Sequence, residues 1–262
     1  MKERKLVAAL ACRAGGTRLY GKPLQNLERD YTILDHILCA VAAAPNISEA
    51  VLGISEGQEN LPFVDVAHKH EVAYIFGDQK DVLWRLILCG RAAGATDVFR
   101  ITTECPFTAW EYVDEAWQRH CSEGNDITVT EYLPEGLNFE IFTLESLERS
   151  HREGQDAERS EFCSAYPRRV PAQFRIEVMI PPHAQRRPDQ RLTVDYPEDL
   201  ILCRRLWESL KGSAPHIAVQ DIMAWVDGHP EVAGLVKPYV DTKAIWGHVA
   251  EYRGVPLAGE CK

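Results

Sequence analysis

The chain has 262 residues, of which 45% are hydrophobic and 26% are charged, so it is long and apolar enough to bury a sizeable core. Its formal net charge of −10 argues against broad, non-specific binding to nucleic acid or to an anionic membrane surface. No stretch approaches the roughly 20 uninterrupted apolar residues that span a bilayer. We therefore expect a single domain over residues 1–262, with neither nucleic acid nor membrane as a partner.

The cysteines and the start of the chain indicate the compartment. Eight cysteines are scattered without a C-x-x-C pair or a histidine at zinc-ligand spacing, which favours reduced thiols that pack in the core. The apolar run 6–12 ends at Arg13 and lacks the shape of a cleavable signal. A cytoplasmic protein is expected.

Apolar, β-rich runs alternate with segments of helical period, which predicts an α/β sheet in layers. In the first 102 residues the expected strands are 6–11, 50–54, 72–76 and 98–102, and the expected helices are 32–44, 61–70 and 82–93. Such βα repeats imply parallel strands and right-handed crossovers. The fold predicted is a doubly wound, mostly parallel, Rossmann-like sheet, and ligands are expected at the carboxyl ends of its strands.

The second half is less regular. We expect helices at 107–120, 144–152 and 198–210, strands at 127–130 and 192–194, extended chain at 137–142 and 174–180, and a loop at 181–189. Residues 131–191 are expected to form a smaller extended lobe that binds an acceptor or a second subunit. Residues 214–262, whose apolar side chains include Trp225, Val232, Leu235, Tyr239 and Trp246, are expected to pack on the body or on a second subunit.

The segment 13–24, R-A-G-G-T-R-L-Y-G-K-P-L, carries the most chemical information. It leaves the first expected strand as a glycine-rich loop whose backbone N–H groups can surround a polyphosphate, and Arg13, Arg18 and Lys22 add positive charge. It is neither a Walker loop nor a dinucleotide fingerprint. The alternative is an ordinary solvated turn.

This loop resembles the R-x-G-S-T-R-L-P-G-K signature of the cytidylyltransferases that activate Kdo, sialic acid and related acidic sugars, particularly the spore-coat polysaccharide branch. Gly16 stands where the signature has Ser, and Tyr20 where it has Pro. Four further segments resemble the family in order: G-x-x-x-D-V-L-W-R at 77–85, R-I-T-T-E-C-P at 100–106, G-L-N-F-E at 136–140 and L-T-V-D-Y-P-E-D-L at 192–200. Their family counterparts are G-x-x-x-D-V-L-x-R, R-I-T-G-D-C-P, G-L-D-V-E and L-T-V-D-T-P-E-D-L.

The resemblance implies a nucleotidyltransferase domain of the nucleotide-diphospho-sugar transferase type, with roles for individual residues. The expected catalytic residues are Arg13, Arg18 and Lys22. The expected nucleotide-binding residues are Ala11, Arg13, Gly15, Gly16, Thr17, Lys22, Asp81, Arg85 and Thr103. For Asp81 and Arg85 an alternative stays open: Asp81 only caps a helix, and Arg85 lies on the solvent-exposed face of that helix.

Glu104 and Asp195 are the expected metal ligands, because carboxylates at the ends of neighbouring strands offer the hard oxygen atoms that Mg²⁺ prefers. The family has Asp where this chain has Glu104, so the carboxylate stands one methylene further out. Asp195 has an alternative role as the cap of the helix that Pro197 opens.

The acceptor site is less defined. Glu140 and Glu161 match acidic positions of the spore-coat branch, although the family's R-E-H-V reads R-S-E-F-C here at 159–163. Between residues 159 and 191 lie seven arginines of a net-negative chain, among them Arg175, and they can read a carboxylate, phosphate or phosphonate. The alternative for these charges is a solvated loop surface.

The leading hypothesis is a Mg²⁺-dependent enzyme that transfers CMP from CTP to an anionic acceptor and releases pyrophosphate, working as a homodimer. A sugar acid needs a base for its hydroxyl, whereas a phosphonate or phosphate is already ionised at pH 7. The arginines and the lack of an obvious His or Lys base favour the ionised acceptor slightly. The competing hypotheses are a nucleotide-sugar-dependent glycosyltransferase and a non-catalytic nucleotide-binding relative.

Overall fold

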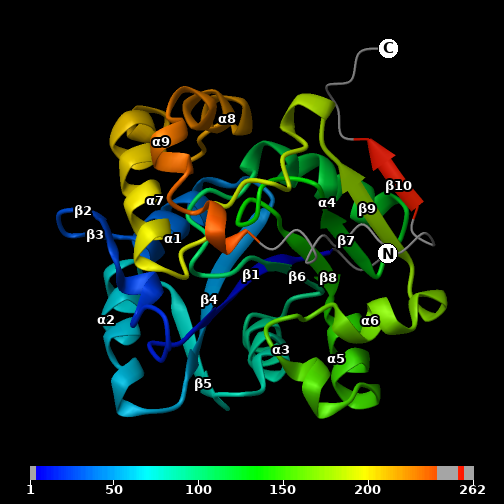
Figure 1. The fold of residues 1–262 in the computed structure, drawn as a ribbon. Coiled ribbons are helices and arrows are strands. Elements are labelled where there is room, and N and C mark those ends of the chain that lie inside the picture. The colour runs from blue at the N-terminus through cyan, green and yellow to red at the C-terminus, as the bar shows by residue number, and fades with distance from the viewer. Residues whose placement is uncertain (1–3, 241–252, 257–262) are drawn as a thin grey trace.

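The computed structural model describes residues 4–240 and 253–256, and all structural statements refer to these residues. Its centre is an eight-stranded sheet in the order β10-β9-β7-β8-β6-β1-β4-β5 (Figure 1). The strands are β1 (Leu6–Cys12), β4 (Ile47–Ser55), β5 (Ala73–Gly77), β6 (Asp97–Arg100), β7 (Ile127–Thr130), β8 (Glu140–Thr143), β9 (Ile176–Ile180) and β10 (Arg253–Pro256). A small antiparallel hairpin, β2 (Asn26–Glu28) and β3 (Tyr31–Thr32), stands outside it.

Most neighbouring strands run parallel, as the βα repeats predict. β1 pairs in parallel with both β4 and β6, β4 with β5, and β7 with β9. Only β8 runs against its neighbours β6 and β7 within the described sheet. The doubly wound, mostly parallel sheet expected from the sequence is therefore confirmed.

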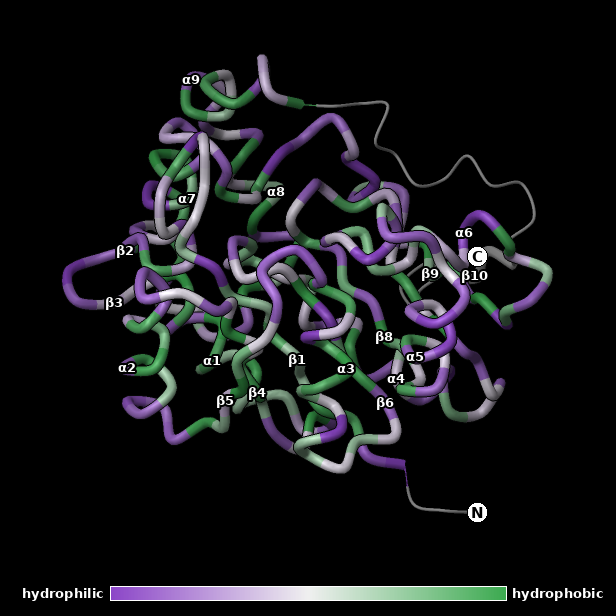
Figure 2. Tube along the Cα trace, turned by 90° about the horizontal axis from the view of Figure 1, so that it is seen from below, coloured by the Kyte–Doolittle hydropathy of each residue, from purple (hydrophilic) through white to green (hydrophobic). Residues whose placement is uncertain are grey.

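Both faces of the sheet are buried, and alternate residues of β1 show this directly. Leu6, Ala8 and Leu10 join one hydrophobic cluster, whereas Val7 and Ala9 join a second one on the other side. Strands covered on both faces are nearly all apolar, as β1 is. Figure 2 shows these central strands as hydrophobic and the β2–β3 hairpin and outer loops as hydrophilic.

Two layers of helices cover the sheet. The first hydrophobic cluster draws on α1 (Ile33–Ala43), α2 (Pro62–Lys69), α4 (Val113–Ser122), α7 (Pro197–Leu210) and α8 (Val219–Gly228). The second draws on α3 (Val82–Ala92), α5 (Leu144–Glu153) and α6 (Ala165–Arg169). None of the described helices combines the length and the apolar character needed to cross a bilayer.

Local capping fixes where several helices begin. Thr32 and Asp35 form a reciprocal capping box at the start of α1. The Asp81 carboxylate accepts the Trp84 backbone N–H at the start of α3, so the predicted cap is confirmed. Thr143 caps α5 in the same way through Ser146.

Some expected elements differ. The chain at 192–194 is not a strand: the isolated bridge next to it joins Arg191 to Glu135, and the chain then bends into α7. The helix expected at 107–120 starts later, with a 3-10 turn at Trp110–Tyr112 and then α4. The extended chain expected at 137–142 becomes strand only from Glu140.

The two expected subregions have different standing. Within 131–191, β8 and β9 are strands of the central sheet, and α5 and α6 cover it, while the acceptor-binding or dimer role of this stretch stays a prediction. The helices α8 and α9 (Pro230–Ala233), which follow α7 in the chain, pack on the body, and Trp225 is buried there. Trp246 lies outside the described residues.

Candidate active site

A cleft opens at the carboxyl ends of β1 and β6, where the fold predicts a ligand site. It is lined by Ala11, Arg13, Ala14, Gly15, Lys22, Pro23, Val82, Arg85, Leu86, Arg100, Ile101, Thr102, Thr103, Glu104 and Glu161. Parallel strands carry loops that are distant in the sequence to one edge, and this brings the glycine-rich loop beside the 100–104 segment.

Backbone hydrogen bonds hold the glycine-rich loop in place. The Gly21 N–H donates to the Ala14 carbonyl at 2.8 Å and closes the loop, while the Ala14 N–H donates to the buried Asn60 Oδ1 at 2.7 Å. Gly15, Gly16 and Thr17 lie exposed between these anchors. The exposed stretch is therefore held from both ends.

Gly16 is required by the conformation of this loop. A Cβ atom at this position would lie 2.4 Å from the carbonyl oxygen of Leu19. This atom belongs to the backbone, so the loop itself would have to shift to relieve the overlap. A serine, as in the family signature, does not fit this conformation.

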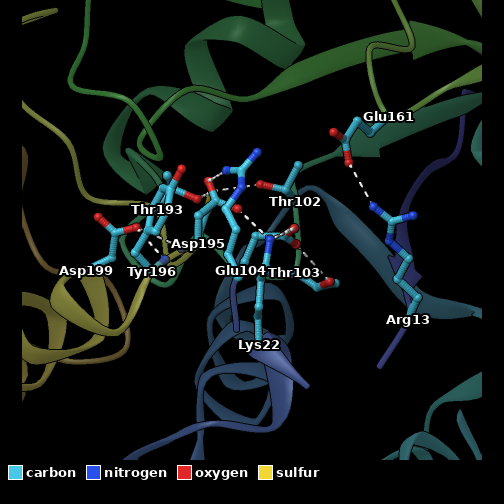
Figure 3. Close-up of polar contacts among 12 residues, drawn as sticks. Arg13, Lys22, Thr102, Thr103, Glu104, Glu161, Thr193, Asp195, Tyr196 and Asp199 are labelled. Atoms are coloured by element: carbon cyan, nitrogen blue, oxygen red, sulfur yellow. Dashed lines mark hydrogen bonds and ion pairs between the residues drawn. The ribbon is translucent and has the colours of Figure 1, made fainter. Parts of the chain in front are cut away.

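Lys22 joins the two expected metal ligands. Its Nζ donates to Asp195 Oδ1 and lies 4.0 Å from Glu104 Oε1, as Figure 3 shows. Arg18 approaches the same carboxylate, with Nη1 3.7 Å from Asp195 Oδ2. Three segments that are far apart in the sequence therefore form one cluster of two cations and two carboxylates.

Asp195 is held by Arg191, the last of the seven arginines for which the sequence left an anionic acceptor and a solvated surface as alternatives. The Arg191 guanidinium donates to Asp195, to Asp199 at 3.0 Å and to Glu135 at 2.6 Å, with only 5% of its side chain exposed. The N-cap of α7 is Tyr196, and Asp199, at the third position of the helix, closes a capping box: its carboxylate accepts the N–H groups of Asp195 and Tyr196. The alternative role of Asp195 as the cap is therefore wrong, and its side chain faces Lys22 instead.

The two carboxylates have shifted pKa values of opposite sign. Burial raises the pKa of Glu104, and the charge of Lys22 offsets this only in part. Burial also acts to raise the pKa of Asp195, but hydrogen bonds and charge from Lys22 and Arg191 outweigh it and lower the pKa. Within the described residues no group of three or more His, Cys, Asp or Glu side chains forms a metal cluster.

Three of the expected nucleotide-binding residues near the strand ends are engaged in the scaffold. The Thr103 hydroxyl donates to the Ala11 carbonyl at 3.0 Å and ties β6 to β1. Arg85 is 1% exposed, and its Nη1 donates to the carbonyls of Cys12 and Gly53. The expectation of Arg85 on a wet helix face is wrong, because the guanidinium bridges β1 and β4. Asp81 pairs with His151 at 2.7 Å besides capping α3.

A second polar group lies beside the cleft, around Arg100. The Arg100 Nη1 donates to Glu140 Oε2 at 3.1 Å, and its Nη2 donates to the Glu161 carbonyl at 2.7 Å. Ser164 donates to the other Glu140 oxygen. The exposed Glu161 carboxylate lies 3.5 Å from Arg13 Nη2, to one side of the Lys22 cluster in Figure 3. Arg100 thus links Glu140, through its carboxylate, to Glu161, through its backbone carbonyl.

Arg175 does not lie at this site. It precedes β9, and its Nη1 donates to the Glu123 carbonyl while its N–H donates to Asp126, which precedes β7. These contacts place it at the amino ends of two parallel strands, whereas the cleft is at the carboxyl ends. The structure therefore does not bring Arg175 together with the other expected acceptor residues at the cleft.

The arginine-rich stretch as a whole does not converge on an anion site. Arg168 pairs with Glu131, Arg169 with Glu158, Arg187 with Asp227, and Arg191 with its three carboxylates. Local carboxylates neutralise these charges. These four arginines therefore do not gather around one anion site.

Sequence reasoning missed Arg100, Arg191 and Asn60 as parts of the site. Arg100 opens the R-I-T-T-E-C-P segment and Arg191 directly precedes L-T-V-D, so both had a signal in their position. Asn60 had none, because it follows a different strand, β4, and meets the loop only in the folded chain.

A wider groove of about 300 Å³ lies between the β2–β3 hairpin and α7. Two of its basic side chains pair with carboxylates of the groove, Lys211 with Glu28 and Arg205 with Glu208, and the third, Arg204, donates to the Asn26 carbonyl. It lacks the convergent strand ends that characterise ligand sites of this fold. We assign the site to the cleft of Lys22.

Comparison with known proteins identifies the family. The family model for cytidylyltransferases matches residues 7–220. The spore coat polysaccharide biosynthesis protein SpsF of Bacillus subtilis is 25% identical over 233 residues, covering 86% of this chain and 95% of that protein.

Solved structures share the fold. A cytidylyltransferase from Leptospira borgpetersenii superposes with a TM-score of 0.79 at 20% identity, covering 88% of this chain and 97% of that one. CMP-2-keto-3-deoxy-manno-octonic acid synthetase complexed with CTP superposes with a TM-score of 0.59 at 14% identity, covering 78% and 99%. The chain belongs to the cytidylyltransferase family and is a nucleotidyltransferase.

Proposed function

We propose that this protein transfers CMP from CTP to a small anionic acceptor and releases pyrophosphate. The observation that carries the proposal is the meeting of Lys22, at the end of the glycine-rich loop, with Glu104 and Asp195 at the carboxyl edge of the sheet. Family membership supports cytidylyl transfer over glycosyl transfer.

The loop would bind the triphosphate. The backbone N–H groups of the exposed residues 15–17 and the side chains of Arg13, Arg18 and Lys22 offer donors and positive charge to its phosphate oxygens. An acceptor oxygen attacks the α-phosphorus in line, and the bond from that phosphorus to the β-phosphate oxygen breaks. Lys22 and Arg18 would stabilise the charge that develops on the departing pyrophosphate.

The donor set fits Mg²⁺ bound mainly by substrate. Magnesium is commonly held by one or two carboxylates and by the phosphates of its nucleotide, so Glu104 and Asp195 suffice for the protein's share. When bound, the ion would polarise the phosphoryl oxygens and neutralise part of the triphosphate charge. Because Lys22 contacts both carboxylates, binding of the ion requires the ammonium group to turn toward the phosphates.

An acceptor that is already ionised suits the cleft better than one that needs deprotonation. The described lining contains no histidine, and its single lysine is bound by carboxylates. A phosphate or phosphonate needs no base at pH 7, only cations that offset its repulsion with CTP. A sugar acid remains the second candidate class, with Glu140 and Glu161 as the groups that would orient its hydroxyls. Homodimerisation and a cytoplasmic location stay predictions.

Pyrophosphate release tests the proposal. The full-length protein is incubated with Mg²⁺, each of the four nucleoside triphosphates, and panels of phosphonates, phosphate esters and sugar acids. We expect release only with CTP and with one acidic class, and a CMP adduct in the mass spectrum. Binding of CTP without turnover across all panels would indicate a non-catalytic relative. In a parallel incubation with nucleotide sugars in place of the triphosphates, transfer of the sugar with release of the nucleotide would indicate a glycosyltransferase.

A further inference from the structure

An aromatic pair stands beside Arg18. The Tyr196 ring stacks on the Tyr239 ring with centroids 4.0 Å apart and planes inclined by 12°. The Arg18 guanidinium lies over the Tyr196 ring, with Cζ 5.0 Å from its centroid. Three segments therefore meet here: the glycine-rich loop, the residue after Asp195, and the 3-10 turn Lys237–Tyr239.

The pair gives Arg18 the partner that an exposed loop does not supply. About half of the Arg18 side chain is exposed, and its carboxylate contact is long, with Nη1 3.7 Å from Asp195 Oδ2. A free arginine side chain loses considerable rotamer entropy when a ligand fixes it. An arginine side chain that already lies against an aromatic ring has fewer accessible rotamers, so it loses less entropy when a ligand fixes it.

Tyr239 lies beyond the part of the chain that the family match covers, which ends at residue 220. The backbone of Tyr196 is itself fixed, because its N–H donates to the capping carboxylate of Asp199 at 2.9 Å. Tyr239 stacks on the ring of a residue whose backbone is fixed in this way. The two stacked rings therefore hold a defined position next to Asp195. The segment that follows α9 thus reaches the active site.

We propose that Tyr196 and Tyr239 are positioning residues that hold Arg18 ready for the triphosphate, so that the segment beyond the family match raises nucleotide affinity. This inference rests on the proposed function, because it assumes that Arg18 binds phosphate. Arg18 is the group that touches substrate, and the tyrosines act through it.

The test is a double-mutant cycle on nucleotide binding. Equilibrium binding of CTP with Mg²⁺, and separately of inorganic tripolyphosphate, is measured by calorimetry without acceptor. We expect Tyr196→Leu and Tyr239→Leu each to weaken both by about threefold to tenfold, the range for a cation–aromatic contact, and Tyr196→Phe and Tyr239→Phe to bind as wild type. In an Arg18→Ala background the leucine substitutions should have no further effect.

The controls separate positioning from a general structural role. Tyr74→Leu removes a ring on the edge strand β5, where it contacts His68 and Phe76, and should leave binding unchanged. Thermal unfolding confirms that each variant is folded. If the leucine effects persist in full after Arg18→Ala, the inference is overturned while the proposed function stands. If wild type binds neither CTP nor tripolyphosphate, both fall.

Discussion

Lys22 acts as the internal counterion of the site. In the free protein its ammonium group lies against Asp195 and within 4.0 Å of Glu104. Its positive charge offsets the repulsion between these two carboxylates at the edge of the sheet. Like charges that share a partly buried site repel strongly, and a cation between them relieves this. A triphosphate with its metal ion would take over that task and release the lysine for catalysis.

Replacing Lys22 by alanine should therefore lower kcat by about 100-fold or more, because such losses are typical when charge stabilisation in the transition state is removed. Steady-state pyrophosphate release measures the effect. Lys211→Ala is the matched control, since this lysine pairs with Glu28 in the groove away from the cleft. Equal rates for the two variants would remove the loop from the active site.

Glu104→Gln should raise the Mg²⁺ concentration needed for half-maximal activity, since a neutral amide is a weaker ligand for a hard cation than a carboxylate. Activity is titrated with Mg²⁺ at saturating CTP. An unchanged titration curve would assign Glu104 to structure alone.

The same substitution should stabilise the fold at neutral pH. Burial raises the pKa of Glu104, so ionising this side chain costs folding free energy above that pKa, and the cost vanishes below the ordinary glutamate value, where folded and unfolded chains are both protonated. The stability advantage of Glu104→Gln over wild type should be largest near about pH 7.5 and should shrink toward about pH 4. Urea unfolding across this range measures it, and an advantage that grows as the pH falls would contradict the sign.

At the scale of elements, the position of Asp195 depends on a close approach of two loops. The Leu192 N–H donates to the Glu135 carbonyl at 2.7 Å, and the Glu135 N–H donates to the Gln190 carbonyl at 3.0 Å. Gly136 lies at this contact with φ of 97°, and a Cβ atom there would lie 2.6 Å from the Thr193 nitrogen. The loop before β8 thus fixes the segment that carries Asp195.

Gly136→Ala should destabilise the protein by about 2 kcal/mol or more, because a left-handed conformation is unfavourable for alanine and the added methyl group meets backbone. Chemical denaturation gives the difference in the free energy of unfolding. Gly94→Ala is the control, since Gly94 has a φ of 61° but open space around its Cα. If Gly136→Ala lowers the free energy of unfolding no more than Gly94→Ala does, the close approach of the Gly136 and Thr193 loops does not contribute to stability.

For the whole molecule, the direction of the strands decides which charges can meet. The cleft is at the carboxyl ends of the parallel strands, and Arg175 lies at the amino ends of β7 and β9. Arg175 belongs to the stretch of sequence that was linked to the acceptor, but the length of the strands separates it from the cleft.

Arg175→Ala should therefore leave the KM for the acceptor within about twofold of wild type, as expected for a surface change outside a site. Glu161→Gln should raise that KM by about tenfold, since hydrogen bonds to a charged group are among the stronger ones. Initial rates at saturating CTP give both values. A large effect of Arg175→Ala alone would place the acceptor elsewhere.

Much of the fold could be predicted because its signals are local. The apolar strand β1, the cap at Asp81 and the βα repeats each lie within a few neighbouring residues. The short strand expected at 192–194 was wrong because its backbone does not pair with one neighbouring strand. The Leu192 N–H donates to the Glu135 carbonyl and the Val194 N–H donates to the Glu104 carbonyl, which belong to two different loops.

By itself, the sequence determined the family resemblance, the parallel α/β sheet and the loop that carries Lys22, because each is written in contiguous residues. Only the tertiary structure decided which charges serve the cleft and which serve the scaffold. Arg85 and Arg191 are buried among carbonyls and carboxylates, and Arg175 lies at the opposite edge of the sheet. The reason is that an ionic partner is chosen by proximity in space, which strand order and direction fix and which sequence distance does not.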